Sequence, residues 1–182
     1  PGNYVVGVTP PATAPVSSTT TVTTDDNGGD GLDNGTQAAS GDEAFSPVIS
    51  LSAGTEPTTE AGAGGTSDDA SGDTNGDMTV DFGFVPTVSI GSLVYQDNSN
   101  DGTFNGTDAP LSGATVTLYE ADGVTPATDA NGAAIAPITT LANGLYYFGN
   151  LLPGNYVVGV TPPATAPVSS TTIVTTDDNG GY

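Results

Sequence analysis

The stretch "GATVTLYEA", residues 113–121, decides the fold class of this chain. Its apolar residues alternate with more polar ones, so that Val116 and Leu118 lie between Thr115, Thr117 and Tyr119. Such alternation puts successive side chains on opposite faces of an extended strand. The stretch therefore predicts a half-buried strand of the kind found in antiparallel sheets.

Short β-branched and aromatic runs of the same kind recur along the chain, between clusters of Gly, Pro, Asn and Asp. Runs bounded in this way predict strands, and no helix longer than a turn is expected. Further strands are expected over residues 3–9, 17–24, 45–52, 78–85, 88–96, 138–151 (two strands around an "NG" turn) and 154–161.

Three of these strands carry more detailed expectations. In residues 3–9 the side chains of Tyr4, Val6 and Val8 share one face, and in residues 78–85 the inward side chains are Met78, Val80, Phe82 and Phe84. Residues 154–161 are expected to pair with the strand that precedes the "LLPG" connection. Many short antiparallel strands in one chain predict an all-β fold, an antiparallel Ig-like β-sandwich.

An internal repeat sets the domain organisation. Residues 1–29 recur as residues 153–181 with a single difference, Thr21 against Ile173, at an offset of 152 residues. Near-identity at this distance is typical of a tandem array. Residues 1–85 are therefore interpreted as the C-terminal part of one repeat and residues 86–182 as the N-terminal part of the next. With only a Pro between neighbouring strands at the boundary, we expect a stiff array.

Charge excludes several classes of partner. The chain has 21 acidic residues, no Lys, Arg or His, and a net charge of −21. Compensating cations must come from solvent, and hard oxygen ligands favour Ca²⁺. Nucleic acid is not an expected partner, because its binders need Lys or Arg against phosphate. No apolar run is long enough to span a bilayer, so no membrane insertion is expected in this segment.

The strongest site signal is "DNSNDGTFNGTD", residues 97–108, which has the spacing of a twelve-residue calcium loop. Alternate residues of a tight loop point their oxygens to one centre, a Gly permits the turn, and a final carboxylate closes the shell. The stretch departs from the usual calcium-loop pattern in having a Ser at position 3 and an Asp, shorter than the usual Glu, at position 12. The alternative to a calcium site is a solvated turn. The expected ligands are Asp97, Ser99, Asp101, Thr103 (through its carbonyl), Asn105 and Asp108.

Two further acidic loops are weaker calcium candidates, and each could equally be a charged surface loop. Neither matches the full template. The first offers Asp25, Asp26, Asn27, Asp30 and Asp33, and the second offers Asp69, Ser71, Asp73, Asn75 and Asp77.

The chain has few side chains that could act in catalysis, because it contains no His, Lys or Cys to serve as base or nucleophile. We therefore expect no enzyme. The Thr-rich stretches could carry surface glycans, and "NGT" at 34–36 and 105–107 has the form of a glycosylation sequon.

Four motifs together resemble the SdrD B-like (Cna-B-related) repeat of bacterial surface proteins. They are "GSLVYQD" at 91–97, the Asp/Asn-rich loop at 97–108, "GATVTLY" at 113–119 and "GLYYFGNLLPGNYVV" at 144–158. The resemblance implies an Ig-like β-sandwich, calcium in the loop from Asp97 to Asp108, and a place in a stalk or fibre on a bacterial surface. Cna-B relatives can carry an isopeptide bond, which the absence of Lys excludes here.

Three functions remain open from the sequence. The first is a calcium-stiffened structural repeat of an extracellular filament, stalk or surface layer that associates with its own copies. The second is an adhesin module that binds a host, matrix or carbohydrate ligand, and the third is a passive spacer in a secreted enzyme. The near-identity of the repeated residues favours the first.

Overall fold

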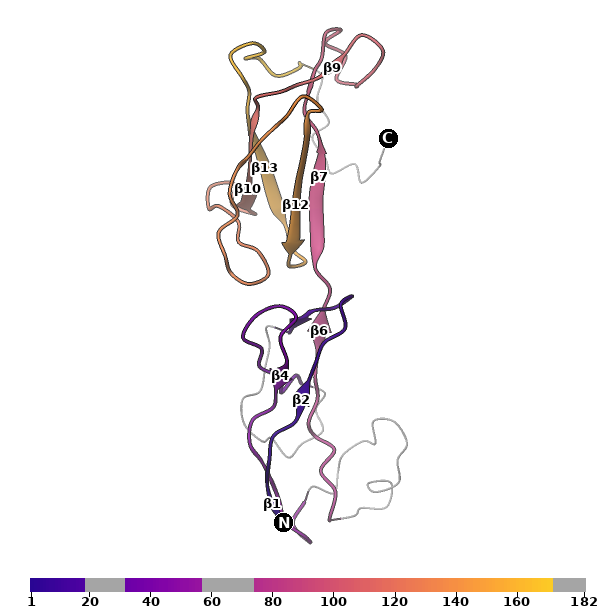
Figure 1. Ribbon diagram of the computed structural model, residues 1–182, viewed down its shortest axis with the longest axis vertical. Coiled ribbons are helices and arrows are strands. Elements are labelled where there is room, and N and C mark those ends of the chain that lie inside the picture. The colour runs from indigo at the N-terminus through magenta and orange to yellow at the C-terminus, as the bar shows by residue number, and fades with distance from the viewer. Residues whose placement is uncertain (19–31, 57–73, 172–182) are drawn as a thin grey trace. The chain divides into compact units, whose positions relative to one another are not determined.

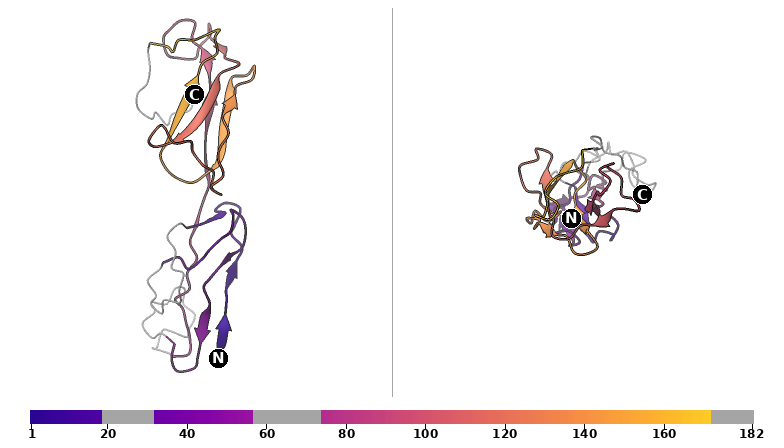
Figure 2. Two further views of the ribbon diagram at one scale, coloured as in Figure 1. Left: turned by 90° about the vertical axis from the view of Figure 1, so that its left-hand side faces the viewer. Right: turned by 90° about the horizontal axis from the view of Figure 1, so that it is seen from above.

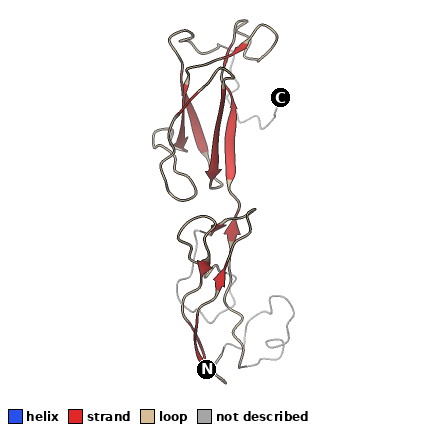
Figure 3. Ribbon diagram, viewed as in Figure 1, coloured by secondary structure: helices blue, strands red, loops and turns tan. Residues whose placement is uncertain are grey.

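The computed structural model describes residues 1–18, 32–56 and 74–171. It divides into two compact units, Pro1–Thr87 and Val88–Tyr182. Every assigned element in the described residues is a strand, and all paired strands are antiparallel (Figure 3). The predicted all-β class and the predicted lack of long helices are thus confirmed for this part of the chain. That the units belong to successive repeats stays a prediction.

The second unit is a sandwich of two small sheets (Figure 1; Figure 2). One sheet has the order β11-β10-β13, and the other pairs β12 with β7. A two-stranded ladder, β8 with β9, completes the unit. The strand bounds are β7 Val88–Leu93, β8 Tyr95–Gln96, β9 Ala109–Pro110, β10 Thr115–Glu120, β11 Ile138–Thr139, β12 Leu145–Leu151 and β13 Tyr156–Thr161.

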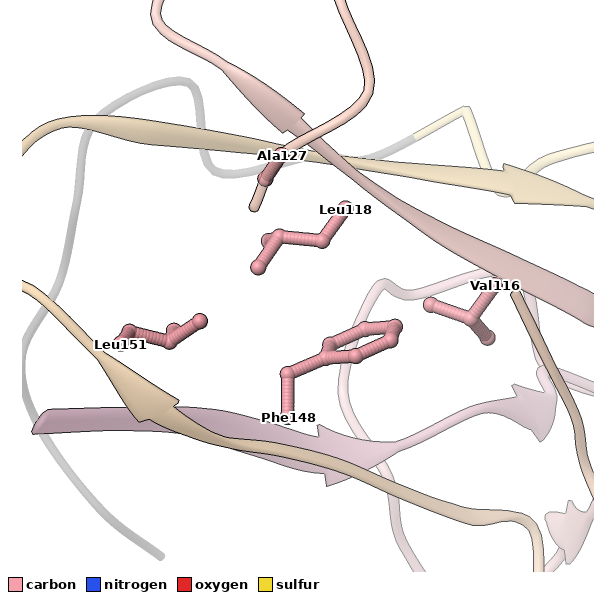
Figure 4. Close-up of a cluster of buried hydrophobic side chains, with 5 residues drawn as sticks. All are labelled: Val116, Leu118, Ala127, Phe148 and Leu151. Carbon is pink, nitrogen blue, oxygen red and sulfur yellow. The ribbon is translucent and has the colours of Figure 1, made fainter. Parts of the chain in front are cut away.

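The core of the second unit lies between its sheets. Val116 and Leu118 of β10 face Phe148 and Leu151 of β12, and all four side chains are at most 3% exposed (Figure 4). Ala127 closes one side of this cluster. The alternation in residues 113–121 is confirmed, because the neighbours of Val116 and Leu118 in β10 (Thr115, Thr117 and Tyr119) are only partly buried.

A β-bulge explains how Phe148 and Leu151, three residues apart, both reach the core. Strict alternation would place only one of them inward. The register between β12 and β7 shifts after Phe148, and Asn150 adopts a left-handed φ of 56°. The extra residue rotates the end of the strand, so that Leu151 returns to the inner face.

The two strands expected around the "NG" turn are present as β11 and β12, but the predicted pairing of residues 154–161 with the strand before "LLPG" is wrong. β11 and β12 flank the turn but lie in different sheets, and β13 pairs with β10, not with the strand before "LLPG". The connection therefore crosses from one layer to the other, as in a sandwich. Gly144 of the turn has φ +68°, and an added Cβ would lie 2.4 Å from the Val94 carbonyl oxygen.

The first unit is built from short two-stranded ladders: β1 with β5, β2 with β4 and β3 with β6. Pro47 separates two of its strands, so the expected strand over residues 45–52 is divided. The bounds are β1 Gly2–Tyr4, β2 Gly7–Val8, β3 Val16–Ser17, β4 Ala44–Phe45, β5 Ile49–Leu51 and β6 Phe84–Val85.

Two expectations for the first unit are corrected. Residues 3–9 do not form one strand, and Tyr4 and Val6 are 52% and 41% exposed. In residues 78–85 only β6 is a regular strand, and the deeply buried side chain is Thr79, between the predicted inward residues Met78 and Val80. Thr79 is satisfied locally, because its hydroxyl and N–H both donate to Asp77 Oδ1. Of the expected strand 17–24, residues 19–24 lie outside the described residues.

Candidate metal centre

The acidic loop of residues 97–108 is the connection of the β8–β9 hairpin. β8 ends at Gln96 and β9 begins at Ala109, so the strands flank the twelve residues directly (Figure 1). The Leu111 N–H donates to the Val94 carbonyl at 2.8 Å and extends the base of the hairpin. The loop is thus held by strands on both sides, as its sequence predicts.

Asp97 organises the first half of the loop. Its Oδ2 accepts the N–H of Gly102 at 2.9 Å, and its Oδ1 accepts the Asp101 N–H at 3.3 Å and the Ser99 hydroxyl at 3.2 Å. Gly102 has φ +76°, a left-handed conformation that glycine adopts at little cost. The chain therefore wraps around the Asp97 carboxylate.

Asp108 holds the second half in the same way. Its Oδ1 accepts the Asn98 N–H at 2.8 Å, and its Oδ2 accepts the Asn105 N–H at 2.9 Å. The shorter Asp at the last loop position is therefore drawn inward by two backbone donors.

The two halves bring three carboxylates together. Ligand oxygens of Asp97, Asp101 and Asp108 all lie within 4.8 Å of one another, and this is the one such group found in the part of the chain that the structure describes. Like charges this close repel, and no basic side chain exists to compensate them. A cation among the three carboxylates would remove this repulsion.

Hydrogen bonds keep two of these carboxylates ionised. The pKa of Asp97 is lowered to about 2, first by a hydrogen bond from the Ser170 side chain and then by backbone N–H groups of the loop. The pKa of Asp101 is also lowered, first by the N–H of Thr103 and then by the Ser99 side chain, although the charge of Asp97 opposes this. The ionised form, which ligation of a metal requires, is therefore favoured in both groups.

The donor set fits a hard divalent cation of the Ca²⁺ type, because every candidate ligand atom is an oxygen. The Asn105 amide nitrogen lies 2.8 Å from Asp101 Oδ2 and 3.2 Å from the Thr103 carbonyl. Asn105 and that carbonyl therefore border the cluster, as the loop spacing predicts. To ligate a cation, Asn105 would turn its amide so that the oxygen replaces the nitrogen.

Sequence reasoning missed the residues that fasten this loop to the rest of the unit. The Asn100 side chain donates to Thr171 Oγ1 at 2.8 Å, and the Thr171 N–H donates to Asn100 Oδ1 at 2.9 Å. The Ser170 side chain lies near enough to Asp97 to lower its pKa. The sequence offered no local signal, because 71 residues separate the Asn100–Thr171 partners.

The other two acidic loops are only partly described. Asp25, Asp26, Asn27, Asp30, Asp69, Ser71 and Asp73 lie outside the described residues. Asp33 is buried, with Oδ1 accepting the Gly35 N–H at 2.8 Å. Asn75 Oδ1 accepts the Gly54 N–H at 3.1 Å. Asp77 Oδ2 is buried and has no hydrogen-bond partner among the described residues. Metal binding by these loops stays a prediction.

One sequon is inaccessible. Asn34 is 2% exposed, and its Oδ1 accepts the Asp81 N–H at 2.8 Å. A glycan at this side chain would disrupt the first unit.

Residues 88–181, which include the acidic loop and both sheets of the second unit, match the SdrD B-like domain. The chain belongs to the SdrD B-like domain family. The fold class, the expected family and the expected place outside the cell, on the cell surface, are thereby confirmed. The match is to a surface-protein domain, not to an enzyme.

Several relatives of this SdrD B-like chain carry informative names. The "Fibrinogen-binding protein" of Staphylococcus epidermidis is 35% identical over 67% of the chain, which spans 10% of that protein. The "Bone sialoprotein-binding protein" of Staphylococcus aureus (strain MRSA252) is 31% identical over 76% of the chain, 12% of that protein. "Colossin-A" of Dictyostelium discoideum is 34% identical over 63% of the chain, 1% of that protein. The chain thus corresponds to a small part of each.

No solved structure matches this SdrD B-like chain. A search of its described residues finds no helix with the length and apolarity needed to cross a membrane.

Proposed function

We propose that this chain is a structural, calcium-binding β-sandwich repeat of an extracellular stalk, filament or surface layer. The observation that carries the proposal is the convergence of Asp97, Asp101 and Asp108 in a hairpin loop. Ca²⁺ supplies the positive charge that the side chains of the molecule lack, and the loop provides carboxylate and carbonyl oxygens around one point.

Calcium bound here would also stiffen the unit. The loop is bonded to Thr171, which follows β13 in the chain, through the Asn100 side chain. A cation that fixes Asp97 would therefore fix the hairpin and the segment after β13 together. Removing the cation restores repulsion among three carboxylates and loosens both.

We place the chain in an array that associates with itself. Residues 1–85 and 86–182 are proposed as parts of two successive repeats, because residues 1–29 and 153–181 are nearly identical. Repeated, near-identical units present the same surface at regular intervals, which favours association between copies. Catalysis, nucleic-acid binding and membrane insertion form no part of this proposal. The remaining acidic residues of the two partly described loops are secondary calcium candidates.

An adhesin module is the second candidate. The names of two relatives refer to binding of fibrinogen and of bone sialoprotein. The chain matches only about a tenth of each relative, so the named binding could belong to another part of those proteins. Surface plasmon resonance of the chain against immobilised fibrinogen, with and without Ca²⁺, tests this candidate.

Thermal unfolding of the whole chain, in excess Ca²⁺ and then in excess EDTA, tests the leading proposal. Ligand at a hundredfold excess over its Kd stabilises by about 2.7 kcal/mol. For a unit of this size, each kcal/mol shifts Tm by roughly 4–8 °C. We therefore expect Ca²⁺ to raise Tm by about 10 °C or more, and Mg²⁺ at the same concentration to do less.

A matched pair of variants assigns this effect to the cluster. Asp101→Asn removes one carboxylate of the three and should weaken calcium binding at least tenfold in a calorimetric titration. Asp122→Asn is the control, because Asp122 also accepts backbone N–H bonds in a turn of the same unit but is not in the cluster. Equal calcium affinity in both variants, or no calcium effect on the parent chain, would overturn the proposal.

A further inference from the structure

Asn-Gly is a dipeptide that can modify itself without an enzyme, and this chain contains several copies of it. The backbone nitrogen of the Gly attacks the side-chain carbonyl carbon of the Asn, and the amide nitrogen leaves as ammonia. Gly favours the reaction because it has no side chain to hinder the attack. Five Asn-Gly pairs lie in the described residues, and they begin at Asn34, Asn75, Asn105, Asn131 and Asn143.

The hydrogen bonding of the glycine amide distinguishes these pairs. For attack, the Gly nitrogen must lose its proton and approach the Asn side chain, so a hydrogen bond from that N–H to another group opposes the reaction. The Gly35 N–H donates to a side-chain oxygen at 2.8 Å, and the N–H groups of Gly132 and Gly144 each donate to a carbonyl of their own turn at 2.9 Å. In these three pairs the nucleophile is therefore engaged.

The Gly106 N–H, in contrast, has no hydrogen-bond partner among the described residues. The Asp108 N–H donates to the Asn105 carbonyl at 2.9 Å and closes a β-turn in which Gly106 is the first central residue. Such a turn uses the N–H of its last residue and not that of its first central residue. Asn105 and Gly106 are both exposed, so water reaches the reacting atoms.

The Asn105 side chain is held beside this amide. The Thr107 N–H donates to Asn105 Oδ1 at 3.5 Å, which closes an Asx-turn around Gly106. Asn105 Nδ2 donates to Asp101 Oδ2 at 2.8 Å and to the Thr103 carbonyl at 3.2 Å. These bonds fix the orientation of the side-chain amide. The Thr107 N–H also donates to the oxygen that gains negative charge during the attack.

Two of the other pairs lack this arrangement of the side chain. Asn75 Oδ1 accepts the Gly54 N–H at 3.1 Å, so its side-chain carbonyl is bonded to a distant segment and not to its own turn. Asn34 is 2% exposed, and its Oδ1 accepts the Asp81 N–H at 2.8 Å. In both pairs the electrophile is occupied elsewhere.

Asn143 offers the most direct comparison with Asn105, because it lies in the same unit and is also exposed. Its Oδ1 accepts the Leu145 N–H at 3.2 Å, the same side-chain arrangement as at Asn105. Gly144, however, donates to a turn carbonyl, is buried and has φ +68°. The two pairs thus differ in the state of the glycine amide.

We propose that Asn105 is a site of spontaneous deamidation in the folded chain. The Gly106 nitrogen loses its proton to water and forms a bond to Asn105 Cγ. The C–N bond of the side-chain amide breaks, and the leaving nitrogen takes a proton from water and departs as ammonia. Water then adds to either carbonyl carbon of the resulting five-membered succinimide and opens it to aspartate or isoaspartate. One water is consumed for each ammonia released, and nothing is oxidised or reduced.

The modification would change the acidic loop irreversibly with the age of the molecule. Either product has a carboxylate in place of the amide, so the net charge becomes one unit more negative than −21. The present amide donates to Asp101, whereas a carboxylate there only accepts and repels Asp101. The isoaspartate product also lengthens the backbone by a CH₂ group within the turn that Asp108 closes.

Deamidation rates of the whole chain, incubated in EDTA at mildly alkaline pH, test the proposal. Chymotrypsin cuts after Phe, Tyr and Leu, so it releases Asn105 in residues 105–111 and Asn143 in residues 142–145. Chromatography separates the aspartate and isoaspartate forms of each peptide, and mass spectrometry quantifies them. The same incubation in concentrated urea gives the rate at each site without structure.

We expect Asn105 to react at least as fast in the folded chain as in urea, because its Gly amide is free and its side chain is positioned. Asn143 should react about tenfold or more slowly in the folded chain than in urea, since its turn must open first. Asn131 is a second internal control, because the Gly132 amide is engaged. Asn105 slowed by folding as strongly as Asn143, or equal rates at the three sites without urea, would overturn the proposal.

A Gly106→Ala variant tests whether the Gly106 nitrogen is the nucleophile. An added Cβ at Gly106 meets no atom within 4 Å, and Gly106 does not have a left-handed φ, so the turn accepts alanine. The methyl group hinders ring closure, and we expect deamidation at Asn105 to fall about tenfold while the rate at Asn143 stays the same. An unchanged rate at Asn105 would refute the proposal. Because the incubation contains EDTA, neither result depends on the proposed calcium binding.

Discussion

At the scale of single residues, Asp97 has two roles in the acidic loop. Its carboxylate accepts three hydrogen bonds from the loop itself. It also contributes one of the three charges of the cluster. The first role shapes the loop without a metal, and the second adds repulsion that a bound cation would remove. If the loop binds the proposed cation, it is shaped in advance for that ligand.

The pKa of Asp97 predicts how stability depends on pH in EDTA. Its folded value is about 2, below the ordinary 3.8, so the ionised form is favoured by folding. The stabilisation is present above pH 3.8 and is lost as pH falls through about 2. We expect Asp97→Asn to lower Tm above pH 4, and the gap to the parent chain to close between pH 4 and pH 2. A gap that does not change with pH would contradict this assignment.

At the scale of elements, Thr140 joins β11 to the start of β10. This side chain is 2% exposed, accepts the Ala114 N–H at 3.0 Å and donates to the Leu111 carbonyl at 2.7 Å. Its backbone N–H donates to the Ala114 carbonyl at 2.8 Å. One hydroxyl thus satisfies a buried donor and a buried acceptor at the edge of the core.

Replacing this hydroxyl should destabilise the second unit. Thr140→Val keeps the shape but leaves the Ala114 N–H and the Leu111 carbonyl without their partner, which costs about 1–3 kcal/mol. The neighbouring Thr139 is exposed, so Thr139→Val is the matched control and should change little. Urea unfolding of the two variants measures the difference. Similar midpoints would show that another group, such as water, satisfies these atoms.

Local patterns predicted the elements of this chain better than their pairing. The alternation around Val116 and Leu118 correctly predicted the strand β10. The spacing from Asp97 to Asp108 correctly predicted a loop between two strands. The partner of β13 was predicted wrongly, because strand order depends on layer packing over long separations. The bulge at Asn150 and the contact of Asn100 with Thr171 have no local sequence pattern that marks them.

The two copies of "PGNYVVGVT" show directly that a local sequence does not determine the partner of a strand. The same residues form a continuous strand beside β10 and two short strands beside residues 44–51. Pro47 in the second partner interrupts the ladder, so the sequence of the partner, not of the strand itself, divides β1 from β2.

At the scale of the whole molecule, the charge of −21 without any basic side chain leaves repulsion uncompensated. Monovalent salt screens this repulsion over a Debye length of about 30 Å at 0.01 M and about 3 Å at 1 M. We expect Tm in EDTA to rise steadily with NaCl at pH 7. The salt effect should shrink near pH 2.5, where most carboxylates are protonated. A fall in Tm with salt at pH 7 would contradict this account.

The duplicated strand also has a consequence for the kinetics of folding. In the second unit the pairings of β10 with β13 and of β7 with β12 join residues far apart in the chain, so forming these pairs requires the closure of long loops. Before β10 has paired with residues 153–161, residues 1–9 of the same chain have an identical sequence and can pair with it instead. A chain refolding from denaturant can therefore pair β10 with the wrong copy and must unpair before it reaches the native state. The same repetition that suits an array would slow the folding of each member.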